Sequence, residues 1–142
     1  MVHALKEAWR VSRSTVLDIR PLVNAPQIWV KDRAGREANC GALVRRATAP
    51  ENHAGATEAL AQALSAGWFT RVAAQQFDWV DAFEDADSLV DEVTEEWDNW
   101  LIDEDTALTL VRALDRAGRG ARPFIRQGIG AQVLKKAGAK LV

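Results

Sequence analysis

The sequence contains few of the residues that most often carry chemistry in a protein. Its 142 residues include one cysteine, one methionine, two histidines and no tyrosine. Cys40 has no partner for a disulfide within the chain, which favours a cytoplasmic, reducing location. His3 and His53 are far apart and lack the spacing of metal ligands. The sequence therefore predicts neither a disulfide framework nor a metal site.

Long apolar runs are also missing. No stretch approaches the length of a transmembrane helix, and the chain does not open with a basic segment followed by a long apolar run. We therefore expect no membrane partner. The length is natural for one domain, which can bury about two-thirds of its unfolded surface without disulfides.

A glycine-rich phosphate-binding turn is absent as well. No GxGxxG motif follows an apolar run anywhere in the chain. The nearest candidates are the segments 118–120 (GRG), which follows a predicted helix, and 128–130 (GIG), which lies inside a predicted strand. A helix C-cap and a strand with small residues explain these segments better than a nucleotide site does.

Charge is present in quantity but is unevenly distributed. Between Val72 and Val111 there are thirteen acidic residues and no lysine or arginine, whereas eight basic residues follow from Arg112 onward with only Asp115 against them. The two regions are self-complementary within one chain or between two copies, although two ordinary solvated faces are the simpler interpretation. The acidic block would repel phosphates, so nucleic acid is not an expected partner.

The chain is organised around residues 4–21, ALKEAWRVSRSTVLDIRP. Met1, Leu5, Ala8 and Trp9 fall at helical spacing and predict a helix with one buried stripe. The segment Thr15–Ile19 is a nearly continuous apolar run, which is typical of a strand covered on both faces. Arg20 and Pro21 then end the predicted strand.

This segment resembles the later part of class I S-adenosylmethionine-dependent methyltransferases, in which a helix of the type EAxRVLRPGG leads into a fifth strand of the type LLLDIRP. Here the helix reads EAWRV and the strand reads VLDIRP, but SRST replaces the Pro-Gly-Gly turn. The likeness continues more loosely through a GWF-led strand, further helices and a last strand ending VLKKAG. The resemblance implies that the half of the family's fold with the cofactor site is missing, so no cofactor is expected.

Periodicity predicts the remaining elements. The helix after residue 85 is expected to bury a stripe that includes Leu89, Val93, Trp97 and Trp100, and the next helix to turn Leu108, Val111 and Leu114 inward. In chain order we expect a hairpin over 27–46 around Gly35, a helix ending at Gly67, a strand over 68–80, a helix capped by Asp85, a helix from about Asp103 to Gly118, and a strand over 124–134.

These elements predict a single domain over residues 1–142 of the α/β (α+β) class. We expect a small mixed β-sheet, like a truncated methyltransferase sheet, with about four helices and an extra β-hairpin outside the main sheet. The resemblance implies that the last strand is inserted antiparallel between the opening strand and the strand over 68–80.

Arg20 is the strongest candidate for a ligand-binding residue. It follows the carboxyl end of a parallel-type strand, where α/β folds place their ligands. Asp18, two residues earlier, is on the same side of the strand and is alternatively its salt-bridge partner. Trp29, Trp97 and Trp100 are weaker candidates for the wall of a pocket for a flat or cationic ligand, and more often such residues belong to the core. No catalytic residue is predicted.

A methyltransferase sheet that lacks its first half has an unpaired apolar strand edge. We therefore expect a homodimer through the Thr15–Ile19 edge or the first helix, unless the hairpin covers that edge.

The favoured function is a non-catalytic, methyltransferase-derived domain that acts as a homo-oligomer or small-ligand binder. The alternatives are a subunit that works with a partner chain supplying the missing half, and an enzyme with a new pocket around Arg20. A shortened bacterial gene of this kind could be a mobile or decayed copy.

Overall fold

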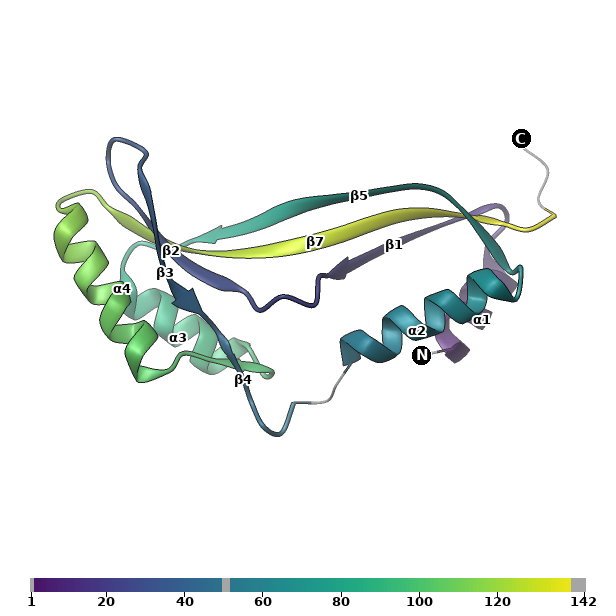
Figure 1. Cartoon of the computed structure of the whole chain (residues 1–142), viewed down its shortest axis with the longest axis horizontal. Helices are drawn as coiled ribbons and strands as arrows, with labels where there is room; N and C mark the ends of the chain where they lie inside the picture. The colour runs from purple at the N-terminus through teal and green to yellow at the C-terminus, as the bar shows by residue number, and fades with distance from the viewer. Residues whose placement is uncertain (1, 50–51, 139–142) are drawn as a thin grey trace. The chain divides into compact units, whose positions relative to one another are not determined.

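The computed structural model describes residues 2–49 and 52–138. Within these ranges it has helices and a small, largely antiparallel sheet with a hairpin, which confirms the predicted fold class (Figure 1). Met1, the first residue of the predicted helical stripe, lies outside the described residues. The elements are α1 (Val2–Val11), β1 (Thr15–Pro21), β2 (Gln27–Lys31), β3 (Glu37–Ala42), β4 (Val44–Arg45), α2 (Asn52–Ser65), β5 (Phe69–Ala82), α3 (Ala86–Glu96), β6 (Trp100–Leu101), α4 (Glu104–Ala117) and β7 (Arg122–Lys136).

The last strand, β7, is the strand to which the others in the main sheet attach. β1 pairs antiparallel with residues 129–135 of β7. β5 also pairs with β7, and hydrogen bonds from the Ala137 N–H to the Trp68 carbonyl and from the Phe83 N–H to the Pro123 carbonyl show that this pair is antiparallel. The predicted order of opening strand, last strand and Trp68-led strand is therefore confirmed. Consequently, β1 and β5 run in the same direction.

The predicted hairpin is present, but its expected position outside the main sheet is wrong. Gly35 has a φ of 87° in the turn between β2 and β3, a conformation that suits glycine. β2 pairs antiparallel with residues 122–126 of β7, so the hairpin belongs to the main sheet. The physical reason is the length of β7, whose fifteen residues provide pairing sites for both β1 and β2.

The described residues divide into two compact units, each with its own core. The first unit falls within residues 1–23, 51–77 and 129–142. Its core contains Leu60 and Ala63 of α2, Phe69 of β5 and Leu134 of β7. α1 and α2 lie against each other in this unit (Figure 1). Leu5 and Trp9 of α1 pack against this core, as the predicted stripe requires, together with Val16 of β1.

Only one face of β1 is covered. Val16 packs in the core of the first unit, whereas Leu17 and Ile19 on the opposite face are 60% and 56% exposed. The prediction that this strand is buried on both faces is therefore wrong. An apolar run of this length does not reveal which of its two faces has a helix against it, because successive side chains point to opposite faces.

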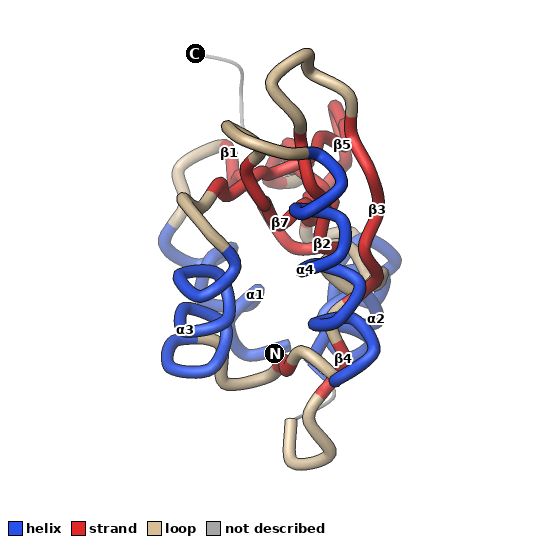
Figure 2. The backbone as a smooth tube through the Cα atoms, turned by 90° about the vertical axis from the view of Figure 1, so that its left-hand side faces the viewer, coloured by secondary structure: helices blue, strands red, loops and turns tan. Residues whose placement is uncertain are grey.

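The second unit falls within residues 24–50 and 78–128. Its core joins one face of the hairpin and β7 to α3 and α4. Figure 2 shows α4 beside β2 and β3, in agreement with their close contacts. The fully buried side chains of this core include Ile28, Val30, Leu89, Val93, Leu110 and Ile125.

The two helices of the second unit begin where the sequence predicts. The Asp85 carboxylate accepts the Ser88 N–H at 2.8 Å, and the Asp103 carboxylate accepts the Thr106 N–H at 2.9 Å. Each bond satisfies a donor that the first turn of the helix cannot pair internally. Gly118, with a φ of 75°, ends α4 as predicted.

The residues that α3 and α4 bury differ in part from those predicted. α3 ends at Glu96, so Trp97 and Trp100 lie beyond the helix rather than on its buried stripe. In α4 the fully buried side chain is Leu110, while Leu108 and Val111 are 46% and 49% exposed. The prediction that Leu108 and Val111 face inward is wrong. Leu110 packs against β2 and β3 instead, together with the small residues of the following turns.

Candidate functional site

The candidate site lies on the helix-covered face of the strands in the first unit. Along each strand, this face changes from apolar side chains beside α1 and α2 to polar side chains farther from the core. Alternation along a strand keeps every second residue on the same face, so the polar positions can be identified by counting from the core residue. The same-face series are Val16, Asp18 and Arg20 on β1; Leu134 and Gln132 on β7; and Phe69, Arg71 and Gln75 on β5.

The polar end of this face forms an open cleft with a volume of about 370 Å³. Arg20 from β1, Gln132 from β7, Arg71 from β5 and Thr57 from α2 contribute to its lining. The side chain of Leu22, which follows β1, packs over Gly130. A β-carbon added at Gly130 would lie 3.2 Å from Leu22 Cδ2. A cleft of this volume suits a small organic molecule.

An ion pair and an amide position the β1 side of the cleft. The Arg20 Nε and Nη2 atoms both lie 3.0 Å from Asp18 Oδ2. The same carboxylate oxygen accepts a hydrogen bond from Gln132 Nε2 at 2.8 Å. Both members of the ion pair are largely buried, with side chains 26% and 17% exposed. Asp18 therefore fixes Arg20 and Gln132 in place, and the ion pair that was the alternative interpretation of Asp18 is present.

Arg71 differs from Arg20 in having no carboxylate partner. It is exposed, and in residues 2–49 and 52–138 it takes part in no ion pair. Its side chain leaves the same face of β5 as Phe69, and it lines the cleft together with Arg20. The cleft thus contains one guanidinium that is held by a carboxylate and one that is not.

The three tryptophans proposed as pocket walls lie in the second unit. Trp29 of β2 stacks on Phe124 of β7, with 6.5 Å between ring centroids. The Arg126 guanidinium carbon lies 4.6 Å from the centroid of the Trp29 ring and forms a 2.7 Å ion pair with Glu37. Hydrogen bonding to Arg126 lowers the pKa of Glu37. This cluster ties β2, β3 and β7 together on the face opposite the core.

Trp97 and Trp100 contribute to the core of the second unit. The Trp97 ring lies 6.2 Å from that of Trp79 on β5. The Trp100 carbonyl accepts a hydrogen bond from Arg46 Nε at 2.9 Å. None of the three candidate tryptophans lines the Arg20 cleft, and ligand binding by them stays a prediction.

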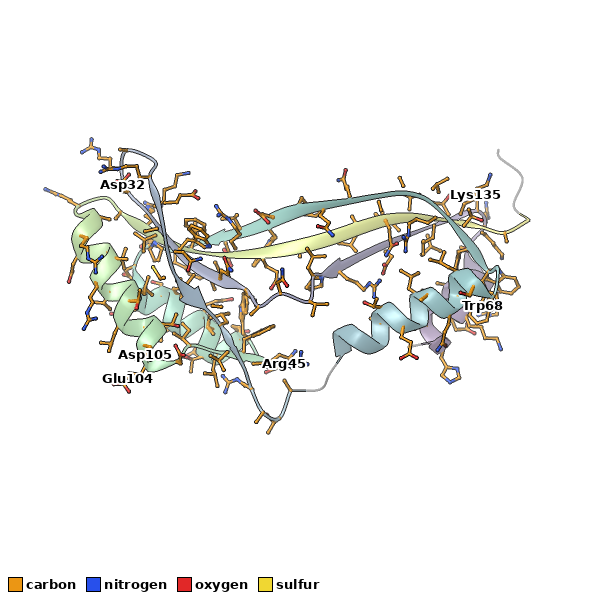
Figure 3. The ribbon with its side chains drawn as sticks, viewed as in Figure 1. Asp32, Arg45, Trp68, Glu104, Asp105 and Lys135 are labelled. Carbon is orange, nitrogen blue, oxygen red and sulfur yellow. The ribbon has the colours of Figure 1, made fainter. Side chains whose placement is uncertain are left out.

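Two other side chains of reactive types, Cys40 and Asp32, are respectively buried and hydrogen-bonded within the fold. Burial raises the pKa of the Cys40 thiol, which is 4% exposed and hence a poor nucleophile. Asp32, at the hairpin turn in Figure 3, accepts the N–H groups of Ala34 and Arg36, and these bonds lower its pKa. Among the described residues, no cluster of histidine, cysteine and acidic side chains could hold a metal ion. No helix in the described ranges is long and apolar enough to cross a membrane.

Comparisons of this chain with protein-family models, curated proteins and solved structures find no match. The assignment of the site therefore depends on its geometry. Of the residues in the cleft, sequence reasoning identified Arg20 but missed Arg71 and Gln132. The signal that could have found them is the switch from apolar to polar residues at alternate positions of β5 and β7.

Proposed function

We propose that this chain is a non-catalytic, methyltransferase-derived domain that binds a small ligand in the Arg20 cleft and works as a homodimer. The observation that carries the binding function is the convergence of two arginines and several amide side chains, from three strands, on one cleft of about 370 Å³. The derivation is supported by the strand order β1-β7-β5, with β7 antiparallel to both neighbours. The methyltransferase resemblance implies this order for the later part of the sheet.

Binding without catalysis is favoured by the chemistry of the lining. The described residues that line the cleft are arginine, glutamine, threonine, glycine and apolar residues. The Asp18 carboxylate beside them is already engaged by Arg20 and Gln132. General acid–base catalysis near neutral pH needs a group that can exchange a proton in that range. Arginine remains protonated and amides do not titrate, so these side chains orient a ligand rather than transfer its protons.

Backbone-amide NMR titrations with a library of small polar fragments test the binding function. We expect some fragments to shift the amide signals of Gly130, Gln132 and Gln75 in a saturable manner, because these residues line the cleft. S-adenosylmethionine should leave all signals in place. The proposal fails if no fragment shifts the cleft signals, or if S-adenosylmethionine binds with micromolar affinity.

The homodimer is supported by the outer edge of β1. The Ser14 carbonyl accepts the Lys136 N–H of the β7 side at 2.7 Å. Because the backbone groups of successive residues in an antiparallel strand point to alternate edges, those of Thr15, Leu17 and Ile19 point away from β7. Within the described part of the chain, no strand pairs with this edge. An unpaired edge with exposed apolar neighbours favours association.

A second copy of β1 fits this edge with a two-fold axis at Leu17. In this antiparallel register Leu17 lies opposite Leu17 of the other copy, and Thr15 lies opposite Ile19, so every outward N–H of these residues meets a carbonyl. Pro21, which has no N–H, falls beyond the paired segment. Asp18 lies opposite Val16, so no like charges directly face each other.

Cysteine cross-linking tests both the dimer and its register. Leu17→Cys should form an intermolecular disulfide, because hydrogen-bonded antiparallel partners have Cα atoms about 5.5 Å apart. Ile19→Cys is the matched control: its two copies would be separated by about 13 Å and should not cross-link. The native Cys40 is buried and should contribute little background. A monomeric mass of the native protein by light scattering at micromolar concentration would contradict the dimer, and efficient cross-linking at position 19 would contradict this register.

A further inference from the structure

We infer that the ligand of the Arg20 cleft is a small organic monocarboxylate that carries a hydrogen-bond donor, with Arg71 as the group that holds its charge. This inference rests on the proposed binding function of the same cleft and adds the chemical class of the ligand. It follows from the unequal pairing of the two arginines, from the sum of charges around them, and from the orientation of one amide.

Arg71 is the cationic group available to a ligand. Asp18 already holds both the Nε and Nη2 atoms of Arg20 at 3.0 Å, whereas Arg71 has no ion pair in the described ranges. A guanidinium presents N–H groups in a planar fork that matches the two oxygens of a carboxylate. A carboxylate that enters the cleft can therefore bind Arg71 without displacing the Asp18–Arg20 pair.

The balance of charge favours one negative charge over two. Asp18 neutralises Arg20, which leaves the single positive charge of Arg71 in the lining of the cleft. A dianion such as the phosphate group would place a second negative charge in the same cleft as the Asp18–Arg20 pair, where no further cation lies among the described lining residues. A monocarboxylate neutralises the positive charge of Arg71 and leaves no charge in the cleft without a partner.

Gln132 adds a preference for a donor on the ligand. Its Nε2 group donates to Asp18 Oδ2 at 2.8 Å, which fixes the orientation of the amide. The other atom of that amide, Oε1, is an acceptor. A hydroxyl or amide N–H close to the ligand's carboxylate can donate to this oxygen while the carboxylate binds Arg71. Leu22 and Val23 supply an apolar wall for the remaining carbon atoms.

The test uses three probes of similar size in NMR titrations of the full chain: lactate, its neutral amide lactamide, and inorganic phosphate. We expect lactate to shift the cleft signals of Gly130 and Gln132 with an affinity at least tenfold higher than that of lactamide or phosphate. The lactate affinity should also fall as the salt concentration rises, because the main contact is between charges.

Two variants separate the role of Arg71 from general charge effects. Arg71→Gln should weaken lactate binding at least tenfold, to the level of lactamide, while the rest of the spectrum shows a folded protein. Arg112→Gln removes an exposed arginine of α4 in the second unit and should leave lactate binding unchanged. Equal loss in both variants, or none in Arg71→Gln, would overturn the inference.

The failure of this inference can be told apart from failure of the binding function. If lactamide or phosphate binds the cleft as tightly as lactate, the cleft still binds small ligands but the monocarboxylate class is wrong. If neither these probes nor any polar fragment shifts the cleft signals, the proposed function itself fails and the inference fails with it.

Discussion

Replacing Leu110 by alanine tests how α4 packs on the hairpin. Leu110 is fully buried among Ile28, Val30 and the side chains of α3. Truncation of such a leucine removes its transfer free energy and leaves a cavity, so we expect a loss of about 3 kcal/mol in the free energy of unfolding. Urea unfolding followed by tryptophan fluorescence measures this loss, because Trp97 and Trp100 pack against the same core.

Leu108→Ala is the matched control, since it makes the same chemical change two residues away in the same helix. Leu108 is 46% exposed, so its truncation removes only part of the transfer term and creates no enclosed cavity. We expect a loss of about 1 kcal/mol or less. Equal losses for the two variants, or a larger loss at Leu108, would refute the helix orientation described here and favour the inward Leu108 that the sequence pattern predicts.

Three further predictions concern the helix caps and two glycines. Hydrogen bonds from Ser88 lower the pKa of Asp85, and hydrogen bonds from Thr106 lower the pKa of Asp103. These caps therefore stabilise the fold at pH values above the pKa that the carboxyl groups have in the unfolded chain. The stabilisation is lost as the pH falls through the lower pKa values of the folded protein. The melting temperature should therefore drop between pH 6 and pH 3, and the drop should be smaller in Asp103→Asn; an equal drop would argue against this role of Asp103. Gly41 has a φ of 133°, and an added β-carbon would lie 2.8 Å from Thr106 Oγ1, so Gly41→Ala should destabilise the protein by more than about 1 kcal/mol. Gly55→Ala, in an open part of α2, should instead stabilise it by about 0.5–1 kcal/mol in the same unfolding measurement; loss of stability there would contradict the helical assignment of this residue.

Local signals in the sequence located most elements because each depends on neighbouring residues. Asp85 and Asp103 cap the helices that they were predicted to begin, and Gly35, Gly67 and Gly118 adopt positive φ values where turns or helix ends were expected. The hairpin and the order of β1, β7 and β5 were also predicted correctly, although the order came from the methyltransferase resemblance rather than from periodicity.

The same local signals did not reveal which side of an element would be covered. In the run from Thr15 to Ile19, the neighbouring residues Val16 and Leu17 are both apolar although they point to opposite faces, so the run predicts a doubly buried strand even though Asp18 interrupts it. In α4, both Leu108 and Leu110 are apolar, and only the fit of the helix against β2 and β3 decides between them. Burial depends on a partner that is distant in sequence, so the pattern of one element does not contain it.

The candidate site shows the same division between local and distant information. By itself, the sequence located the capped helices, the hairpin turn and the strand that carries Arg20, and it offered Asp18 as the alternative partner of Arg20, because each involves residues within a few positions of one another. Only the tertiary structure decided that Gln132, more than a hundred residues later, binds Asp18 and that Arg71 shares a cleft with Arg20. The physical reason is strand pairing: β7 aligns Gln132 with Asp18 through backbone hydrogen bonds, whose register is fixed along the whole ladder rather than by the residues next to either side chain.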